Sequence, residues 1–234
     1  MEPEDPPPCA PGSRKIQLPY LNTFETLWEY RELFLAGKIN FFSSISPACP
    51  LCGHLHCYRE IPPYWRYVLE LFPEFKKERI PIARFLCRKT RRTFSLLPIQ
   101  LIPYFQYTLS AVMGTLLLGW GYGQRGQQGF WGATVEVDPE SLVTPWLVAF
   151  WLAAILRGLR RGHAVLGRFY DLTGIRTPKR AALWEQAAGY FLALGLKPKI
   201  RWSPLLMDLV SRYSRTTKQF LFGLPSQQRA SVRS

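Results

Sequence analysis

The sequence predicts a mainly α-helical protein with a small β subdomain. Two runs without any charged residue, Pro98 to Gly119 and Ser141 to Leu156, have the apolar content and periodicity of buried helices. Residues 40–97 instead combine short apolar runs with proline and glycine, which is typical of strands and turns. Hydrophobic residues make up 47% of the 234 residues, so the composition excludes a mainly disordered chain.

The predicted organisation has five segments. Residues 1–20 are acidic and proline-rich at their start, carry no apolar signal-peptide core, and are expected to be a disordered tail of a cytoplasmic protein. Residues 21–97 hold an N-terminal helix and the β subdomain, and residues 98–165 form a helical region. A basic helical region follows at 166–224, and residues 225–234 form a second disordered tail.

Local patterns predict the elements of the N-terminal half. A helix is expected from Thr23, as N-cap, to Leu35, because its apolar residues recur at helical spacing. A further helix is expected from Tyr64 to Lys77. The runs 80–87 and 93–97 are each apolar and short, and they predict a hairpin around Cys87.

Helices are expected through the C-terminal half. Within the first charge-free run an apolar stripe recurs at spacings of three and four, which predicts an amphipathic buried helix: Leu101, Phe105, Leu109, Val112 and Leu116. Asp138-Pro-Glu140 has the acids and proline of a helix start. Two more helices are expected at 178–194 and 204–222.

The cysteines predict a metal site in the β subdomain. Cys49-Pro-Leu-Cys52 has the C-x-x-C spacing that binds one metal ion from a tight turn, and Cys87 begins a second turn in which Thr90 stands at the place of the second cysteine. The chain has five cysteines, an odd number, and no secretory signal is recognised, which favours metal binding over disulfides.

The resulting hypothesis is a zinc site formed by three cysteines and a fourth ligand from the neighbouring cluster. The candidate ligands are Cys49, Cys52 and Cys87 with one of His54, His56 or Cys57. The alternative is a decayed site whose thiols are small buried hydrophobes and whose fold needs no metal. The predicted fold class is therefore mainly α with a small β, zinc-ribbon-like subdomain, degenerate at Thr90.

The charge distribution predicts a polyanionic partner. The net charge is +14, and residues 141–234 hold 15 Lys and Arg against three Asp and Glu, a net of +12. Basic residues cluster with few compensating acids and with aromatic residues between them, which favours DNA as the partner. The predicted contacts are Arg88, Lys89, Arg91, Arg92, Arg157, Arg160, Arg161, Arg176, Lys179 and Arg180.

The cysteine turns also carry a family resemblance. The stretches 49–53, 82–98 and 102–108 resemble an uncharacterised bacterial family in which a zinc ribbon precedes a helix-turn-helix, similar to the N-terminal part of mobile-element transposases. That family pattern has a cysteine where Thr90 stands. The resemblance implies DNA binding by the helical module, with residues 144–151 at the place of a recognition helix.

These observations favour a non-catalytic DNA-binding or accessory protein of a bacterial mobile element, with DNA and proteins of that element as partners. Only three acidic residues follow Glu140, too few for the metal-binding acids of a recombinase, and no known catalytic motif is recognised, so an enzyme is not expected. The alternative is a membrane-associated protein with a helical hairpin at 98–156, flanked by arginines. Its second run is short for a membrane span, which makes a membrane partner the weaker hypothesis.

Overall fold

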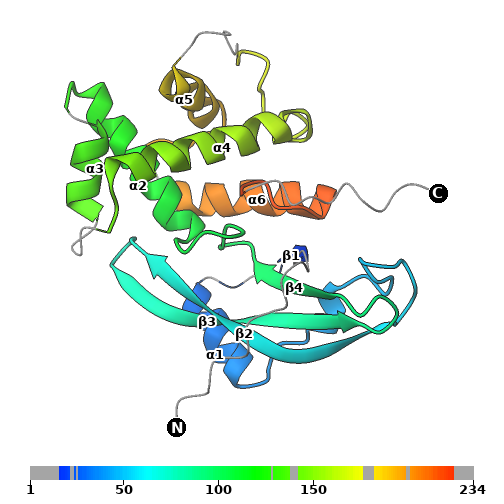
Figure 1. Ribbon diagram of the computed structural model, residues 1–234. Coiled ribbons are helices and arrows are strands. Elements are labelled where there is room, and N and C mark those ends of the chain that lie inside the picture. The colour runs from blue at the N-terminus through cyan, green and yellow to red at the C-terminus, as the bar shows by residue number, and fades with distance from the viewer. Residues whose placement is uncertain are drawn as a thin grey trace. The chain divides into compact units, whose positions relative to one another are not determined.

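The computed structural model is an α/β fold. It describes residues 16–21, 24, 26–127, 129–137, 142–175, 182–198 and 201–223, which form six α-helices, one 3₁₀ helix and a four-stranded mixed sheet (Figure 1). The sheet holds strands of up to 13 residues and is a principal element of the fold. The expectation of a mainly α protein with a small β subdomain is therefore wrong.

The chain forms two compact units. Within the described residues, unit 1 lies in the ranges 16–66 and 79–98, and unit 2 lies in the ranges 67–78 and 99–223. Two strands, β2 (Tyr58–Glu70) and β3 (Lys76–Cys87), belong to both units, because their joined ends and the turn between them lie in unit 2.

The sheet has the strand order β1-β4-β3-β2. Strand β1 (Ile16–Tyr20) pairs in parallel with β4 (Thr93–Pro98), and β4 pairs antiparallel with β3. The hairpin predicted around Cys87 is thus confirmed. Strand β1 falls within the segment expected to be an N-terminal tail, because its apolar residues pair with β4 instead of remaining solvated.

The prediction of a helix at 64–77 is also wrong, and the absence of that helix explains most of the error in fold class. Residues 58–70 are rich in aromatic and β-branched side chains, which favour a pleated, half-buried surface. Helical periodicity is a weak signal in a segment this short, and pairing with a neighbouring strand overrides it. The result is the long hairpin of β2 and β3.

Aromatic side chains fill the core of unit 1. The helix α1 (Leu27–Leu35) begins after Thr26, whose hydroxyl accepts a hydrogen bond from the amide of Glu29 at 3.1 Å. Tyr30 of α1 is fully buried, and its hydroxyl donates to the carbonyl of Pro81 at 2.9 Å. Phe85 and Phe94, paired across β3 and β4, stack with ring centroids 5.2 Å apart. The 3₁₀ helix η1 (Phe41–Ser44) adds further aromatic contacts. The predicted N-cap Thr23 lies outside the described residues.

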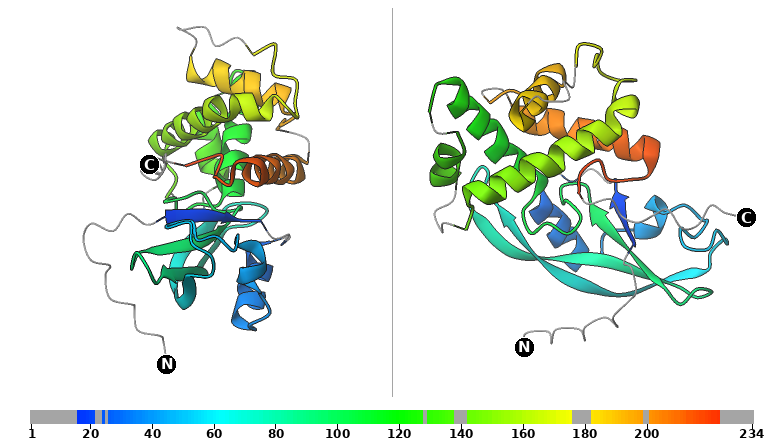
Figure 2. Two further views of the ribbon diagram at one scale, coloured as in Figure 1. Left: turned by 90° about the vertical axis from the view of Figure 1, so that its right-hand side faces the viewer. Right: turned by 45° about the horizontal axis from the view of Figure 1, so that its top comes forward.

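Unit 2 is built around one long helix. The helix α4 (Pro145–Leu166) contacts each of four others: α2 (Leu109–Gln124), α3 (Gly129–Val137), α5 (Leu183–Ala193) and α6 (Trp202–Thr217). Figure 2 shows α4 running across this unit, with α5 and α6 beside it. The helix start predicted at 138–140 lies outside the described residues, and Thr144 is the N-cap of α4.

The helix expected in the first charge-free run begins later than predicted. Residues 101–107 form a loop, and α2 starts after Thr108, whose hydroxyl oxygen accepts a hydrogen bond from the amide of Ala111 at 2.9 Å. The same hydroxyl donates to the carboxylate of Glu70 at 2.8 Å. Burial raises the pKa of Glu70, and the hydrogen bonds from Thr108 and from the Leu71 amide partly offset that rise. The first half of α2 is buried almost throughout, so the helix is apolar around most of its circumference there.

Among the described residues, no helix combines the length and the apolar character that a membrane crossing requires.

Two glycines of unit 2 offer a matched test of close packing. A Cβ at Gly158 of α4 would lie 2.5 Å from the carbonyl oxygen of Leu221, whereas a Cβ at Gly189 of α5 meets nothing within 4 Å. We expect Gly158→Ala to lower the free energy of unfolding by about 1–3 kcal/mol, because the backbone near Leu221 must move. Gly189→Ala should instead raise it by about 0.5–1 kcal/mol through helix propensity. Urea unfolding checks both, and equal effects would contradict the packing at Gly158.

Candidate metal centre

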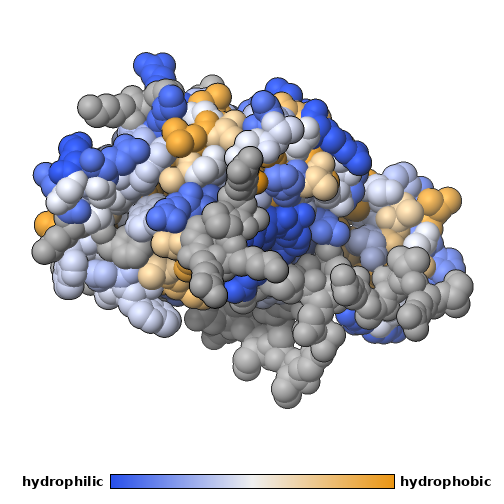
Figure 3. Space-filling model, turned by 90° about the horizontal axis from the view of Figure 1, so that it is seen from above, coloured by the Kyte–Doolittle hydropathy of each residue, from blue (hydrophilic) through white to orange (hydrophobic). Residues whose placement is uncertain are grey.

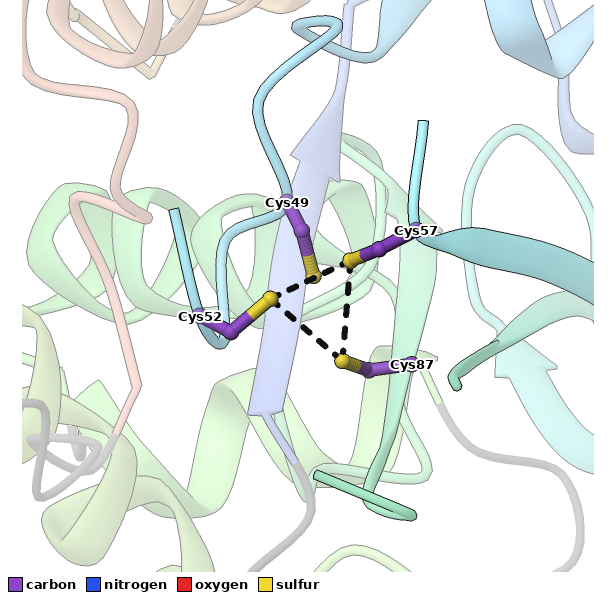
Figure 4. A group of neighbouring side chains, drawn as sticks. All are labelled: Cys49, Cys52, Cys57 and Cys87. Carbon is purple, nitrogen blue, oxygen red and sulfur yellow. Dashed lines mark hydrogen bonds between the residues drawn. The ribbon is translucent and has the colours of Figure 1, made fainter. Parts of the chain in front are cut away.

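Four cysteines of unit 1 converge on one point. The Sγ atoms of Cys49, Cys52, Cys57 and Cys87 lie within 4.8 Å of one another, and this is the one group of potential metal ligands found in the part of the chain that the structure describes. Figure 4 shows the four side chains pointing toward one another. All four are free thiols, and three of them are buried.

The first two ligands come from a tight turn. The amide of Gly53 donates to the carbonyl of Cys49 at 2.8 Å, and Gly53 has a φ of 73°, which glycine adopts without strain. The amide of Cys49 donates in turn to the carbonyl of His54 at 2.9 Å. These hydrogen bonds close the C-x-x-C segment into a loop with both thiols on its inner side.

The other two ligands are brought together by backbone hydrogen bonds between distant segments. Cys57 directly precedes β2, and Cys87 is the last residue of β3. The amide of Arg88 donates to the carbonyl of Cys57 at 2.8 Å, and the amide of Cys87 donates to the carbonyl of Arg92 at 2.9 Å. The sheet therefore fixes the positions of this second pair of thiols.

The sulfur positions fit a tetrahedral metal ion. The Sγ of Cys52 lies 3.1 Å from that of Cys57 and 3.6 Å from that of Cys87, and Cys57 and Cys87 are 3.7 Å apart. Four thiolates about 2.3 Å from a central ion are separated by about 3.8 Å in a regular tetrahedron. These three separations are slightly shorter than that value, and all four sulfurs lie within 4.8 Å of one another, so small side-chain movements suffice to accept an ion. These four cysteines could hold a metal ion.

The fourth sulfur of the group belongs to Cys57, one of the three candidates that the sequence left open. His54 and His56 are both exposed and lie outside the four-sulfur group, and the ring of His54 contacts the carbonyl oxygen of Cys52 at 3.0 Å. No rule of spacing selects Cys57, which lies five residues after Cys52. Its proximity to Cys87 follows from the pairing that places the two segments side by side.

Thr90 bonds to the candidate ligand Cys87 and does not stand in place of a missing fourth cysteine. Its amide donates to the Sγ of Cys87 at 3.4 Å. Burial opposes ionisation of Cys87, but hydrogen bonds from the hydroxyl and amide of Thr90 lower the pKa of the thiol to about 6. Burial raises the pKa of the Cys49 and Cys57 thiols. Thr90 thus favours the thiolate form of Cys87, and a bound cation would favour the loss of protons from the other thiols.

The turn next to Cys87 carries a dense group of positive charge. Arg88, Lys89, Arg91 and Arg92, together called the basic turn, are all exposed, and none forms a salt bridge with a described residue. Arg91 adopts a φ of 56°, which helps to reverse the chain between β3 and β4. Four thiolates around a divalent ion carry a net charge of −2, so a basic turn beside them is also electrostatically favourable.

The other predicted DNA contacts lie elsewhere. Arg157, Arg160 and Arg161 are exposed on α4 in unit 2. Arg160 bonds to the side-chain oxygen of Gln186, and Arg161 donates to the carbonyl of Leu221 at 2.7 Å. The third predicted group lies outside the described residues: Arg176, Lys179 and Arg180.

No family model, curated protein or solved structure matches the chain.

The ligand set can be tested by substitution. Cys57→Ser should weaken metal binding strongly, because the cluster then keeps only three thiolates, whereas the double variant His54→Ala, His56→Ala should bind as the unmodified protein does. Thr90→Cys should not increase the metal-to-protein ratio, since four sulfurs are already present. Elemental analysis and the absorption spectrum of the cobalt-loaded protein measure these outcomes. Loss of metal in the histidine variant, with Cys57→Ser unaffected, would assign the fourth position to histidine.

Proposed function

We propose that the protein is a zinc-dependent DNA-binding protein in which a structural zinc ion holds the basic turn in place. The observation that carries the proposal is the position of that turn directly after a ligand: Cys87 supplies one sulfur, and the next five residues hold four exposed basic side chains. Zinc would therefore fix the presentation of these charges without contacting DNA itself.

Zinc is the metal favoured by the donor set. Four closely spaced thiolates in a tetrahedral arrangement are typical of structural zinc sites, whereas calcium and magnesium prefer oxygen ligands. A set of four protein ligands leaves no position for water or substrate, which favours a structural role over a catalytic one. The burial of three of the four cysteines supports the same conclusion.

DNA is the polyanion favoured as the partner. Arginine and lysine side chains that lack acidic partners gain by replacing the counterions of a phosphate backbone. The resemblance of residues 49–53 and 82–98 to the N-terminal part of mobile-element transposases favours DNA over other polyanions and is consistent with an accessory role in a mobile element. Because the turn projects from a hairpin, it can contact phosphates without any rearrangement of the sheet.

The role of zinc can be tested by removing it. A strong chelator should lower the thermal stability of the protein and weaken DNA binding, because the loop 49–57 and the end of β3 are then no longer joined by a shared ion. Differential scanning calorimetry and fluorescence anisotropy with a labelled duplex measure the two effects, and added zinc should reverse both. Cys57→Ser is the control, since the chelator should change its thermal stability and DNA affinity much less than those of the unmodified protein. If the chelator leaves the DNA affinity unchanged, DNA binding does not need the metal, and the proposed role of zinc is wrong.

The role of the basic turn can be tested by removing its charge. Changing Arg88, Lys89, Arg91 and Arg92 together to glutamine should weaken duplex binding and flatten its salt dependence. The slope of log K against log salt should fall by about 0.9 for each phosphate that the turn neutralises in the unmodified protein. Metal content should not change, because none of these residues is a ligand.

The matched control removes the same number of charges elsewhere. Exposed basic residues of unit 2 that form no salt bridge with a described residue serve this purpose when changed together to glutamine: Arg168, Lys197, Arg215 and Lys218. The control should retain most of the affinity and of the salt slope. If the control weakens binding as much as the variant of the basic turn does, binding follows net charge alone, and the proposed role of the turn is wrong.

A further inference from the structure

The exposed face of α4 is aromatic near the start of the helix and basic further along it. Near its start it presents Trp146, 77% exposed, and Phe150, 41% exposed. Beyond these it presents Arg157, Arg160 and Arg161. At 3.6 residues per turn all five project within an arc of about 100°, so they form one continuous stripe, here called the α4 face. The opposite side of the helix is buried against its neighbours in unit 2.

The aromatic part of the α4 face is a stack of rings with an open outer surface. The rings of Trp146 and Phe150 are nearly parallel, at an angle of 10° with centroids 6.3 Å apart. Phe150 stacks in turn on Phe105 from the loop before α2, with centroids 5.7 Å apart. Packing against Phe105 fixes the orientation of the stack, whereas Trp146 at its outer end is exposed to solvent. The stack is therefore a preformed platform for one more flat, apolar group.

An open cavity adjoins this stack. It has a volume of about 580 Å³ and is lined by Phe105, Phe150, Tyr104 and Gln106 among others. Tyr104 is 54% exposed and has a φ of 69°, an uncommon backbone conformation for an aromatic residue. The space accommodates a ring the size of a nucleobase, and Gln106 provides an amide for hydrogen bonds.

The basic part of the α4 face keeps its charge. Arg160 bonds to the neutral side chain of Gln186, and Arg161 donates to the backbone carbonyls of Phe220 and Leu221. These partners hold the guanidinium groups without neutralising them. Arg157 forms no salt bridge with a described residue and lies about 10 Å along the helix from Phe150. Figure 3 shows one face of the molecule, on which hydrophobic residues lie in small groups among hydrophilic ones.

We propose that the α4 face binds single-stranded DNA, with bases stacked on Trp146 and in the adjoining cavity and with phosphates along Arg157, Arg160 and Arg161. Aromatic platforms beside positive charge are the usual means of binding single strands, because every unpaired base offers a flat face. Bases inside a duplex are already stacked on one another and cannot use the platform. An apolar protein partner would use the aromatic rings but would leave three arginine charges on the same stripe uncompensated.

This inference goes beyond the proposed function, because it concerns a second surface and a different form of DNA and does not require zinc. The two can fail separately. The variant of the basic turn should lose duplex binding and keep single-strand binding, whereas variants of the α4 face should do the reverse.

The test uses the full-length protein and two short oligonucleotides, oligo-thymidylate and an abasic strand with the same number of phosphates. Trp146→Leu should weaken binding of oligo-thymidylate roughly 5- to 100-fold, because it removes one stacking surface and keeps an apolar side chain. It should leave binding of the abasic strand unchanged. Trp131→Leu is the matched control, since Trp131 is an exposed tryptophan on α3.

The charge contribution has its own control. Arg157→Gln should reduce the salt slope for both oligonucleotides by about 0.7, the value for one phosphate of a single strand, and Arg215→Gln should not. Equal affinity of the unmodified protein for the two oligonucleotides, or an unchanged affinity for oligo-thymidylate in Trp146→Leu, would overturn the stacking proposal. Absence of oligo-thymidylate binding at low salt would overturn the α4 face as a site for DNA altogether and leave a protein ligand as the occupant to be tested next.

Discussion

Four sulfur atoms of unit 1 share a volume that suits a single ion, and this constraint sets the geometry of the turn and the strand ends that carry them. Two of the sulfurs come from a local turn, but Cys57 and Cys87 are thirty residues apart in sequence. They meet because the amide of Arg88 bonds to the carbonyl of Cys57 and because β3 ends at Cys87. The sheet and the sulfur cluster therefore impose the same geometry on this end of the molecule. Both the sheet and the sulfur cluster therefore set the position of the basic turn.

The sequence allowed the site to be predicted better than the fold. The C-x-x-C turn and Cys87 identified three of the four sulfurs, because metal-ligand spacing within a turn is a local property. The fourth candidate ligand could be narrowed only to a choice among His54, His56 and Cys57, since the approach of Cys57 to Cys87 depends on strand pairing. The sequence alone predicts a lost ligand at Thr90, because sequence position gives no information about hydrogen bonds to sulfur. The bond from its amide to Cys87 shows a supporting role instead.

The error in fold class has a similar origin. Residues 64–77 have enough apolar content for a helix, and their pairing into β2 and β3 depends on residues that are distant in sequence. The helices α5 and α6 lie close to their predicted positions, because helical periodicity is a local signal. The helix α4 begins within the second charge-free run but extends ten residues beyond Leu156, where that run ends. The arginines of the α4 face are recognisable as a cluster in the sequence. Trp146 and Phe150 align with them only because one helix continues past Leu156, where the predicted apolar run ends, to Leu166.

The hairpin of β2 and β3 makes unit 2 a discontinuous piece of the chain. Residues 67–78 interrupt unit 1 and supply unit 2 with Phe72, whose ring lies where a side chain at Gly114 would have to be, and with Glu70, which bonds to Thr108. A fragment beginning near residue 99 would lack these side chains and expose the buried start of α2. Since each of the two strands extends through both units, unfolding of the hairpin removes native structure from both at once. The molecule should therefore lose its structure in one cooperative step, although its contacts divide into two units.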